Sequence, residues 1–349
     1  MKSLLVLLAM LSGLAHAKDF TAADKSQVTL TDHDLITFPK ELRDGNGDGL
    51  ITPSRKKVAG FFPFLFDGGV QYLNTSTLKK ISGTSYGLKS YVPEVVYTDG
   101  KSKNGVILLK KSISNTTLGP LAVTGAFRAI ETASGVVLNN VVIDGINAIE
   151  LQRDGIRLRT ANDVTIKNFN LKSHDKLNTS PNLPEGIAIS AGKKIVIQDG
   201  TIEGFRMVKS GYTNGDGIAI ERGASDVTIE RVMIIDPSDG GVDLKSTNTK
   251  MNDVTVTKAY RAFRVWVDLE AGTLTSIDSG NAVFGNTNAK IHIKKLIVKS
   301  ETPASVLNLN GKVTITVDEC DLTGMAKGSK MLREEAKGNI IKLGKGCTL

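Results

Sequence analysis

Three aspartates and two basic residues fall within a short stretch of this sequence. Asp216 lies in "NGDGIAIE", Asp239 and Asp243 lie in "SDGGVDLKS", and Lys245 and Arg264 follow. Carboxylates held on a rigid backbone suit a hard cation such as calcium, which takes six to eight oxygen ligands. We therefore expect a calcium site with a basic group beside it, provided that the fold brings these residues together.

A plain structural role competes with this hypothesis. The phrases "NGDG" and "SDGG" are strong turn formers, and turn chemistry alone would explain Asp216 and Asp239. Asp243 differs, because it lies inside a strand-like phrase whose counterparts in neighbouring repeats carry alanine. Arg264 could equally form a surface ion pair with Asp243 and nothing more.

Two phrases alternate along the chain from about Val136 onward. One is a glycine followed by apolar–any–apolar, as in "DGIRLR", "EGIAIS", "DGIAIE" and "GGVDLK". The other opens with a polar pair, as in "NDVTIKNFNL", "KKIVIQDGTI", "SDVTIERVMI" and "NDVTVTKAYR". A period of roughly 22 to 31 residues with short Ile- and Val-rich strands predicts an all-β parallel β-helix. Leucine-rich repeats would need leucine at fixed positions, and a β-sandwich would not repeat one phrase pair in one order.

Superposing the glycine phrases predicts the register of the stacked strands. Side chains alternate between the two faces of a strand, so the apolar positions point inward and those between them outward. The inward columns are Ile156, Ile187, Ile218, Val242, Phe263 and Leu158, Ile189, Ile220, Leu244, Val265. The outward columns are Arg157, Ala188, Ala219, Asp243, Arg264 and Arg159, Ser190, Glu221, Lys245, Trp266. Asp154, Glu185 and Asp216 form one column at the start of these strands, with Asp239 near it.

Substrate-binding residues are expected beside these columns. The long connections "KSHDKLNTSPNLPE" and "FRMVKSGYTNGD" precede two of the strands and should emerge on one side, where Arg206 and Lys209 would add positive charge. Trp266, the one tryptophan, should face outward as a sugar-stacking platform, although burial under a loop is the alternative. Glu221 is expected in the column of Lys245.

These residues resemble the pectate-lyase-like superfamily of right-handed parallel β-helices, particularly its calcium-dependent polysaccharide lyases. The resemblance covers roughly residues 130–320 as a fold and 185–268 as a site. It implies that Asp216, Asp239 and Asp243 bind calcium and that Arg264 of "AFRVW" is the base in β-elimination on a uronate polymer. The sequence departs from the family pattern by one aspartate fewer and by arginine in place of lysine.

Two residues are candidates for the base. Arginine is chemically awkward in this role, because the pKa of its side chain exceeds about 12. Lys245 could act if partial burial and a nearby cation lowered its pKa, but Glu221 would hold it charged. Arg264 is favoured over Lys245.

A second candidate calcium site lies near the N-terminus in "DGNGDGLIT". Asp44, Asn46 and Asp48 follow the spacing of an EF-hand loop, with glycine at the sixth position. The twelfth position is Arg55, where the bidentate carboxylate belongs. The alternatives are a structural calcium and a plain Asn/Gly loop.

The N-terminus and the cysteines predict the compartment and the domain organisation. "MKSLLVLLAMLSGLAHA" has the charged start, apolar run and small-residue end of a signal peptide spanning residues 1–17, so a secreted or periplasmic protein is expected. A disulfide between Cys320 and Cys347 would close the C-terminal segment. We expect an N-terminal cap and irregular first rungs over 18–100, with the EF-hand-like loop at 44–55, and the β-helix with its C-terminal cap over 101–349.

The net charge and the composition of the chain indicate which classes of binding partner are expected. Forty-four basic and thirty-six acidic residues give a net charge of +8, which favours an anionic partner. Aromatic residues are 5% of the chain and do not interleave with basic runs, which disfavours nucleic acid. No stretch is apolar enough to span a membrane. We expect a monomer that acts on an acidic polysaccharide.

The leading functional hypothesis is a calcium-assisted polysaccharide lyase. A uronan C5-epimerase shares the proton abstraction, and an inverting glycoside hydrolase would use paired aspartates. The "GHG" and "RIK" segments of related galacturonan hydrolases are absent from the sequence. A non-catalytic carbohydrate-binding protein or adhesin is the alternative outside the enzymes.

Overall fold

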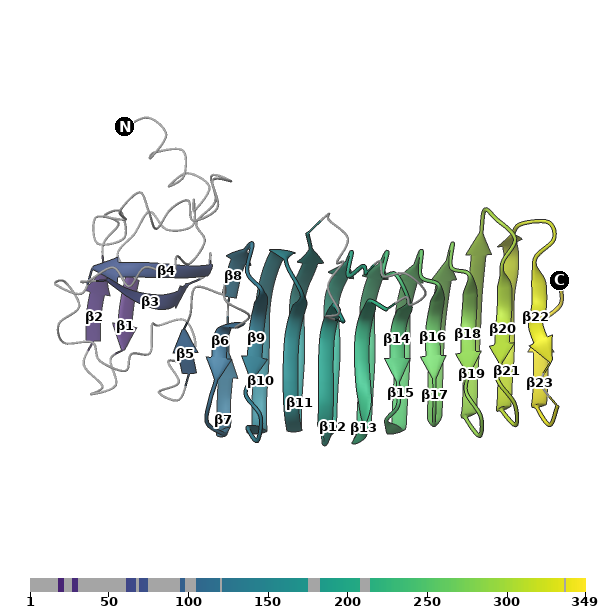
Figure 1. Ribbon diagram of the computed structural model, residues 1–349, viewed down its shortest axis with the longest axis horizontal. Coiled ribbons are helices and arrows are strands. Elements are labelled where there is room, and N and C mark those ends of the chain that lie inside the picture. Colours follow the sequence, from purple (N-terminus) through teal and green to yellow (C-terminus); the bar gives the residue numbers. More distant parts are fainter. Residues whose placement is uncertain are drawn as a thin grey trace, which may run out of the picture.

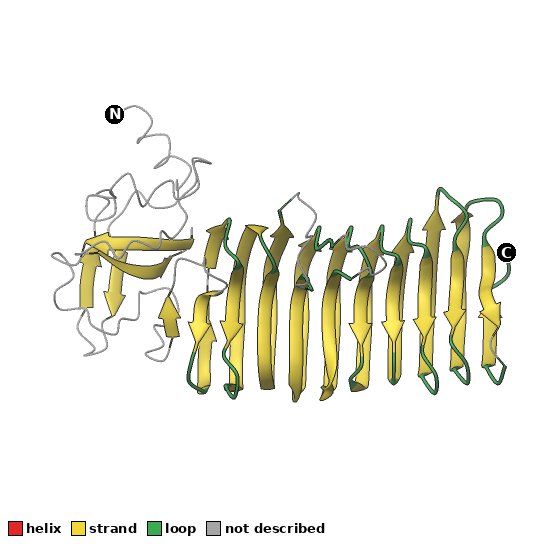
Figure 2. Ribbon diagram, in the orientation of Figure 1, coloured by secondary structure: helices red, strands yellow, loops and turns green. Residues whose placement is uncertain are grey.

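The computed structural model describes residues 18–21, 27–30, 61–66, 69–74, 95–97, 105–119, 121–174, 183–207, 214–335 and 337–349. All regular secondary structure in these ranges is β-strand (Figure 2). None of the described segments is an apolar helix long enough to cross a membrane. The expected signal peptide (1–17) and EF-hand-like loop (44–55) lie outside the described residues.

In the described part of residues 1–104, five short strands precede the repeats. They are β1 (Lys18–Thr21), β2 (Gln27–Leu30), β3 (Phe61–Phe66), β4 (Gly69–Asn74) and β5 (Val95–Tyr97). β1 pairs with β2 and β3 with β4, both antiparallel, and β5 pairs antiparallel with the first strand of the repeats. The limits of the N-terminal cap at 18–100 stay a prediction.

The rest of the chain is a parallel β-solenoid whose coils stack along the long axis of the molecule (Figure 1). Strands β10 to β13 pair in succession, and from β13 onward two parallel series form, one of even-numbered and one of odd-numbered strands. The all-β fold class is thus confirmed. The strands are β6 (Gly105–Leu109), β7 (Ile113–Leu118), β8 (Leu121–Thr124), β9 (Arg128–Thr132), β10 (Val137–Leu151), β11 (Asp154–Ser173), β12 (Glu185–Glu203), β13 (Asp216–Ile235), β14 (Gly240–Leu244), β15 (Thr247–Thr257), β16 (Arg261–Val265), β17 (Asp268–Ile277), β18 (Asn281–Gly285), β19 (Lys290–Ser300), β20 (Ser305–Leu309), β21 (Thr314–Met325), β22 (Lys330–Glu335) and β23 (Ile340–Lys345).

The predicted register of the glycine phrases is confirmed. Ile187 pairs with Ile218, Ile218 with Val242, and Val242 with Phe263. Every side chain of the two inward columns is exposed by 1% or less, so these columns form the core of the solenoid. Burial of such aliphatic side chains contributes about 1.5–3 kcal/mol each relative to exposure.

Close approach of the stacked strands explains why glycine recurs in the first phrase. A Cβ atom on Gly186 would lie 2.5 Å from the carbonyl oxygen of Gly217 and 2.4 Å from Cγ2 of Ile202. On Gly217 it would lie 2.6 Å from the carbonyl oxygen of Gly241. Any side chain at these positions would push the stacked strands apart. Glycine is therefore required there, and the outward-facing positions of each strand follow directly after it.

The polar pairs of the second phrase lie at corners of the coil. Asp163, Lys194 and Asp226 have φ angles of 55°, 56° and 54°, which Asn and Asp adopt more readily than most residues. The phrase "NDVTVTKAYR" lies one corner further along than expected, because Val254 pairs with Val232 and not with Val227. The shorter coil formed by β14 and β15 accounts for this difference.

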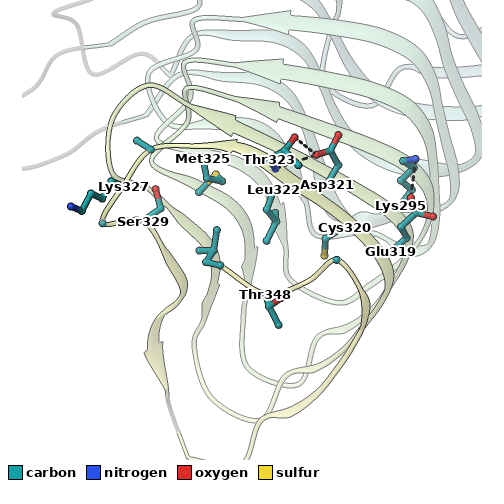
Figure 3. Close-up of a pocket in the computed structure, with 14 residues that line it drawn as sticks. Lys295, Glu319, Cys320, Asp321, Leu322, Thr323, Met325, Lys327, Ser329 and Thr348 are labelled. Atoms are coloured by element: carbon teal, nitrogen blue, oxygen red, sulfur yellow. Dashed lines mark hydrogen bonds and ion pairs between the residues drawn. The ribbon is translucent and has the colours of Figure 1, made fainter.

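The C-terminal end is closed covalently. A disulfide joins Cys320 of β21 to Cys347 after β23, which confirms the predicted bond. An open hollow of about 750 Å³ lies beside it (Figure 3). Thr323, Met325 and Thr348 line the hollow, and its charged groups include the Lys295–Glu319 ion pair, with Nζ and Oε1 3.0 Å apart. None of the sequence-predicted site residues lines it.

Candidate functional site

The predicted aspartates and Arg264 do come together on the outward side of the solenoid. β12, β13, β14 and β16 are successive neighbours there (Figure 1), and the register sets Asp243 beside Arg264. Asp216, at the start of β13, accepts a hydrogen bond from the backbone N–H of Gly240 at 2.7 Å. Asp239 immediately precedes β14. We call Asp216, Asp239, Asp243 and Arg264 the aspartate cluster.

One guanidinium faces all three carboxylates. Nη1 of Arg264 lies 2.8 Å from Oδ2 of Asp239 and 3.5 Å from Oδ1 of Asp216, and its Nε lies 3.7 Å from Oδ1 of Asp243. These four side chains are exposed by only 3–12%, so water screens their interactions weakly. The cluster is thus a buried ion-pair network on rigid strands.

This arrangement does not fit the expected calcium ion. Arg264 contacts all three carboxylates that calcium would need, and both oxygens of Asp239 bind arginines, Arg261 and Arg264. Within the described residues, no group of three His, Cys, Asp or Glu side chains could hold a metal ion. An arginine side chain thus lies where the sequence suggested a cation, and the calcium ligand set stays a prediction.

Burial favours protonated carboxyls in the aspartate cluster. The pKa of Asp216 is raised well above its usual value by burial and by repulsion from Asp243, although Arg264 opposes the shift. Burial also raises the pKa of Asp239, against the influence of Arg264 and Arg261. Three carboxylates surround one central cation, so the cluster has a tendency to take up a proton.

Lys245 remains a cation. Its Nζ lies 2.7 Å from Oε1 of Glu221 and 3.3 Å from Oδ2 of Asp243. Burial acts to lower the pKa of Lys245, but Asp243 and Glu221 outweigh it and the pKa is raised. The expected contact with Glu221 is present. The raised pKa and the ion pairs argue against Lys245 as a base, and the three carboxylates around Arg264 likewise favour its charged form.

Trp266 lies beside this cluster but is partly covered. Its Nε1 donates a hydrogen bond to Oδ1 of Asp243, and its ring centroid lies 5.9 Å from Nζ of Lys245 and 5.7 Å from Cζ of Arg264. The ring is half-buried, so at most part of one face is open to a sugar.

Arg206, another predicted binding residue, forms an ion pair outside the aspartate cluster. Nη1 of Arg206 pairs with Oδ2 of Asp236 at 3.2 Å, on the flank of β12 and β13. Lys209 lies outside the described residues, as do the calcium-loop candidates Asp44, Asn46 and Asp48.

An arginine that the sequence reasoning missed adds to the site. Arg261, at the start of β16, pairs through Nη1 with Oδ1 of Asp239 at 3.2 Å. Its Cζ lies 4.5 Å from the ring centroid of Tyr260 and 4.9 Å from that of Phe284. Tyr260 is 40% exposed. The register could have indicated Arg261, because it occupies the strand-start column of Asp216.

A second charged cluster lies on the same face toward the N-terminus. Asp154, which is fully buried, is surrounded by three arginines that we call, together with it, the arginine cluster. Oδ2 of Asp154 lies 2.5 Å from Nε of Arg128 and 3.4 Å from Nη1 of Arg157, and Oδ1 lies 3.6 Å from Nε of Arg153. Arg128 also binds Glu131, with Nη1 and Oε2 2.9 Å apart. Sequence reasoning placed Asp154 in its column but did not recognise these partners.

Comparison with known proteins supports the fold and does not identify an activity. A search among curated proteins finds no matching sequence. A sequence profile described as the right-handed beta helix region matches residues 129–322, which include β10 to β20, most of β9 and β21, and both charged clusters except for Arg128. The match spans more than half of the chain and agrees with the stacked parallel strands. This chain is therefore a member of the right-handed β-helix family.

Proposed function

We propose that the protein is an exported enzyme that binds an acidic, uronate-containing polysaccharide and cleaves it by β-elimination. The observation that carries this proposal is a set of cations held on rigid strands by buried aspartates. Lys245 and Arg261 are 22% and 24% exposed, so each presents part of its charge to solvent while Asp243 or Asp239 fixes its position. The half-buried ring of Trp266 and the exposed ring of Tyr260 lie beside them.

Such a surface suits a sugar carboxylate. Lys245 and Arg261 would each bind the C5 carboxylate of a uronate along the polymer, and the pyranose rings would contact the aromatic side chains. Neutralising that carboxylate acidifies the neighbouring C5–H bond, which is the difficult part of β-elimination. Arg264 would act through its positive charge, because its three carboxylate partners keep it protonated. No step in this proposal uses calcium.

A second function, inverting glycoside hydrolysis, is favoured by one specific observation. Asp216 has a raised pKa and lies close enough to Asp243 for their charges to interact. A protonated and an ionised carboxyl on one face are the two groups that such hydrolysis needs. The low exposure of both side chains, 3% and 5%, makes direct contact with a sugar less favourable than contact with Lys245 or Arg261.

Export is part of the proposal. The first seventeen residues read as a signal peptide, and the disulfide between Cys320 and Cys347 suits an oxidising compartment. Expression of the full chain followed by cell fractionation tests this point. We expect the protein in the periplasm or medium, with a mature N-terminus near Lys18. An uncleaved protein retained in the cytoplasm would contradict it.

The activity is tested with purified mature protein on pectate, alginate and glycosaminoglycans. Unsaturated-uronate absorbance reports elimination, new reducing ends without that absorbance report hydrolysis, and altered residue composition without cleavage reports epimerisation. We expect elimination on at least one polymer. Binding without any product would instead show a carbohydrate-binding protein, and would overturn the proposed activity.

Two variants and a chelator sharpen the test. Lys245→Met and Arg261→Met should each lower kcat/KM about 100-fold, a loss typical of removing one electrostatic contact to the reacting group. Lys172→Met is the matched control, because Lys172 forms a surface pair with Glu203, 3.0 Å between Nζ and Oε1. Activity should persist in excess chelator. If chelator abolishes activity, and added calcium restores it in the wild type but not in Asp243→Asn, calcium binds at the aspartate cluster.

A further inference from the structure

Glu185 lies between the two charged clusters. It begins β12, and the register pairs it with Asp216 at the start of β13. On its other side, its backbone N–H donates a hydrogen bond to Oδ1 of Asp154 at 3.3 Å. Glu185 therefore joins the arginine cluster to the aspartate cluster along one edge of the outward face, one rung from each.

The carboxyl group of Glu185 differs from its neighbours in having no fixed partner. Asp154 is held by arginines and Asp216 by Arg264 and the N–H of Gly240. The Glu185 side chain makes no hydrogen bond or ion pair with any residue in the described ranges, and the residue is half-buried, so solvent reaches it. A carboxyl that is positioned but uncommitted is available to a ligand.

The surroundings of Glu185 bring the pKa of its carboxyl group close to neutral pH. Its pKa is raised to about 7, mainly by burial and also by Asp154 and Glu221, while Arg157 and Arg153 oppose the rise. Asp216 faces it from the next rung. A group with a pKa near the working pH is effective in proton transfer, because both of its forms are populated.

We infer that Glu185 is the catalytic base of this site, touching the uronate of the polymer that lies between the two clusters, where Arg153 and Arg157 face it. The inference rests on the proposed β-elimination. The Glu185 carboxylate takes the proton from C5 of the uronate, the electron pair of that C–H bond forms the C4=C5 double bond, and the C4–O bond breaks. The departing oxygen takes a proton from water, and Glu185 releases its own proton to the resulting hydroxide. Atoms and charges balance without an external oxidant or metal.

The test replaces Glu185 by glutamine, which keeps its shape and removes its proton chemistry. Glu185→Gln should lower kcat 100- to 10,000-fold, the usual contribution of a general base, with KM changed less than about threefold. Glu203→Gln is the matched control at the other end of β12, where the carboxylate is 39% exposed and bound to Lys172. The control should keep wild-type kcat.

A pH profile separates catalysis from a structural role. In the wild type, kcat/KM should rise through about pH 7, and Glu185→Asp should retain such a limb at a shifted pH with reduced rate. Circular dichroism and binding to the same polymer show that the glutamine variant is folded. If Glu185→Gln keeps wild-type activity and an unchanged pH profile, Glu185 is not the base, and the proposed β-elimination still stands. A wild-type protein that eliminates no uronan would overturn the proposed function and this inference with it.

Discussion

The aspartate cluster and the arginine cluster occupy the same face of one solenoid with opposite compositions. Three carboxylates surround Arg264 in the first, whereas three arginines surround Asp154 in the second. The central residue of each cluster contacts all three partners, and some of these partners come from other rungs, Arg128 for Asp154 and all three aspartates for Arg264. Parallel stacking places the same column position about 4.8 Å apart on every rung, so charges of one sign would repel unless the opposite sign were interleaved.

The two clusters differ in how easily they can adapt when their central charge is lost. The carboxyls of the aspartate cluster can take up protons, and the pKa values of Asp216 and Asp239 are already raised. Arginines cannot lose their charge in this way, but Arg153 and Arg157 are 18% and 20% exposed and can turn to water. The aspartate cluster should therefore respond to pH, and the arginine cluster should respond to hydration.

The largest effect is expected from Arg264→Met. Removing the cation that contacts all three carboxylates leaves buried Asp216 with no cation, while Asp239 and Asp243 keep only Arg261 and Lys245. This should lower the free energy of unfolding by about 3–5 kcal/mol at pH 7. The loss should be smaller at pH 5, because the aspartates can then take up protons. Urea unfolding at both pH values measures this difference. Arg231→Met, which removes an arginine that is 46% exposed and paired with Asp199, should cost less than about 1 kcal/mol. Equal losses in the two variants would contradict the buried network.

Asp154→Asn should have the next largest effect. The amide keeps the shape of Asp154 but removes the charge that binds three arginines, so we expect a loss of about 2 kcal/mol in the free energy of unfolding. Arg128 retains Glu131, and the other two arginines can be hydrated. Unlike that of Arg264→Met, the loss should not become smaller at pH 5, because the charge of Asp154 repels Glu185 only when Glu185 is ionised. A pH dependence as strong as that of Arg264→Met would remove the distinction between the clusters.

The pH dependence of stability tests the environment of Glu185, the residue that lies between the two clusters. Because the folded protein raises the pKa of Glu185 from 4.5 to about 7, it binds this proton more tightly than the unfolded chain does. The stabilisation is complete below pH 4.5 and is lost as the pH rises to about 7. Asp216, whose pKa is also raised, changes stability in the same direction.

The contribution of Glu185 is isolated by difference. Glu185→Gln should flatten the decline of the free energy of unfolding with rising pH, measured by urea denaturation at intervals across this range. Glu203→Gln should reproduce the wild-type curve. Identical curves for wild type and Glu185→Gln would show that the environment of Glu185 does not favour its protonated form.

The register of the site could be predicted from the sequence, but the positions of its charged atoms could not. Repeated glycine phrases align backbone positions, and this correctly set Asp243 beside Arg264 although they are 21 residues apart. The register could not show that an arginine would contact the expected calcium ligands, because it gives no information on where a long arginine side chain ends. The guanidinium of Arg264 reaches back to Asp239 and Asp216 and contacts the oxygens that a cation would bind.

The arginine cluster was missed for a different reason. Arg128 belongs to β9, in a coil whose sequence, "RAIET", lacks the glycine phrase that guided the alignment. Its pairing with Asp154 appears only in the three-dimensional register. Arg261 was likewise passed over, because it ends the phrase "NDVTVTKAYR", which was assigned to the wrong corner. Irregular coils therefore hid Arg128 and Arg261, while the regular phrases revealed the carboxylates and Arg264.

The smallest effect on stability is expected from Glu221→Gln, at the outer edge of the aspartate cluster. Glu221 is 46% exposed, so losing its ion pair with Lys245 should change the free energy of unfolding by no more than about 0.5 kcal/mol. The pKa of Lys245 should fall, because one of the two carboxylates that raise it is gone, and an NMR titration of its side chain measures the change. Affinity for an anionic polymer should rise several-fold, since Lys245 then gives up no ion pair with Glu221 when it binds the ligand, and keeps Asp243. Unchanged or weaker polymer binding would show that Lys245 does not contact the ligand, and would move the binding surface toward Arg261 and Tyr260.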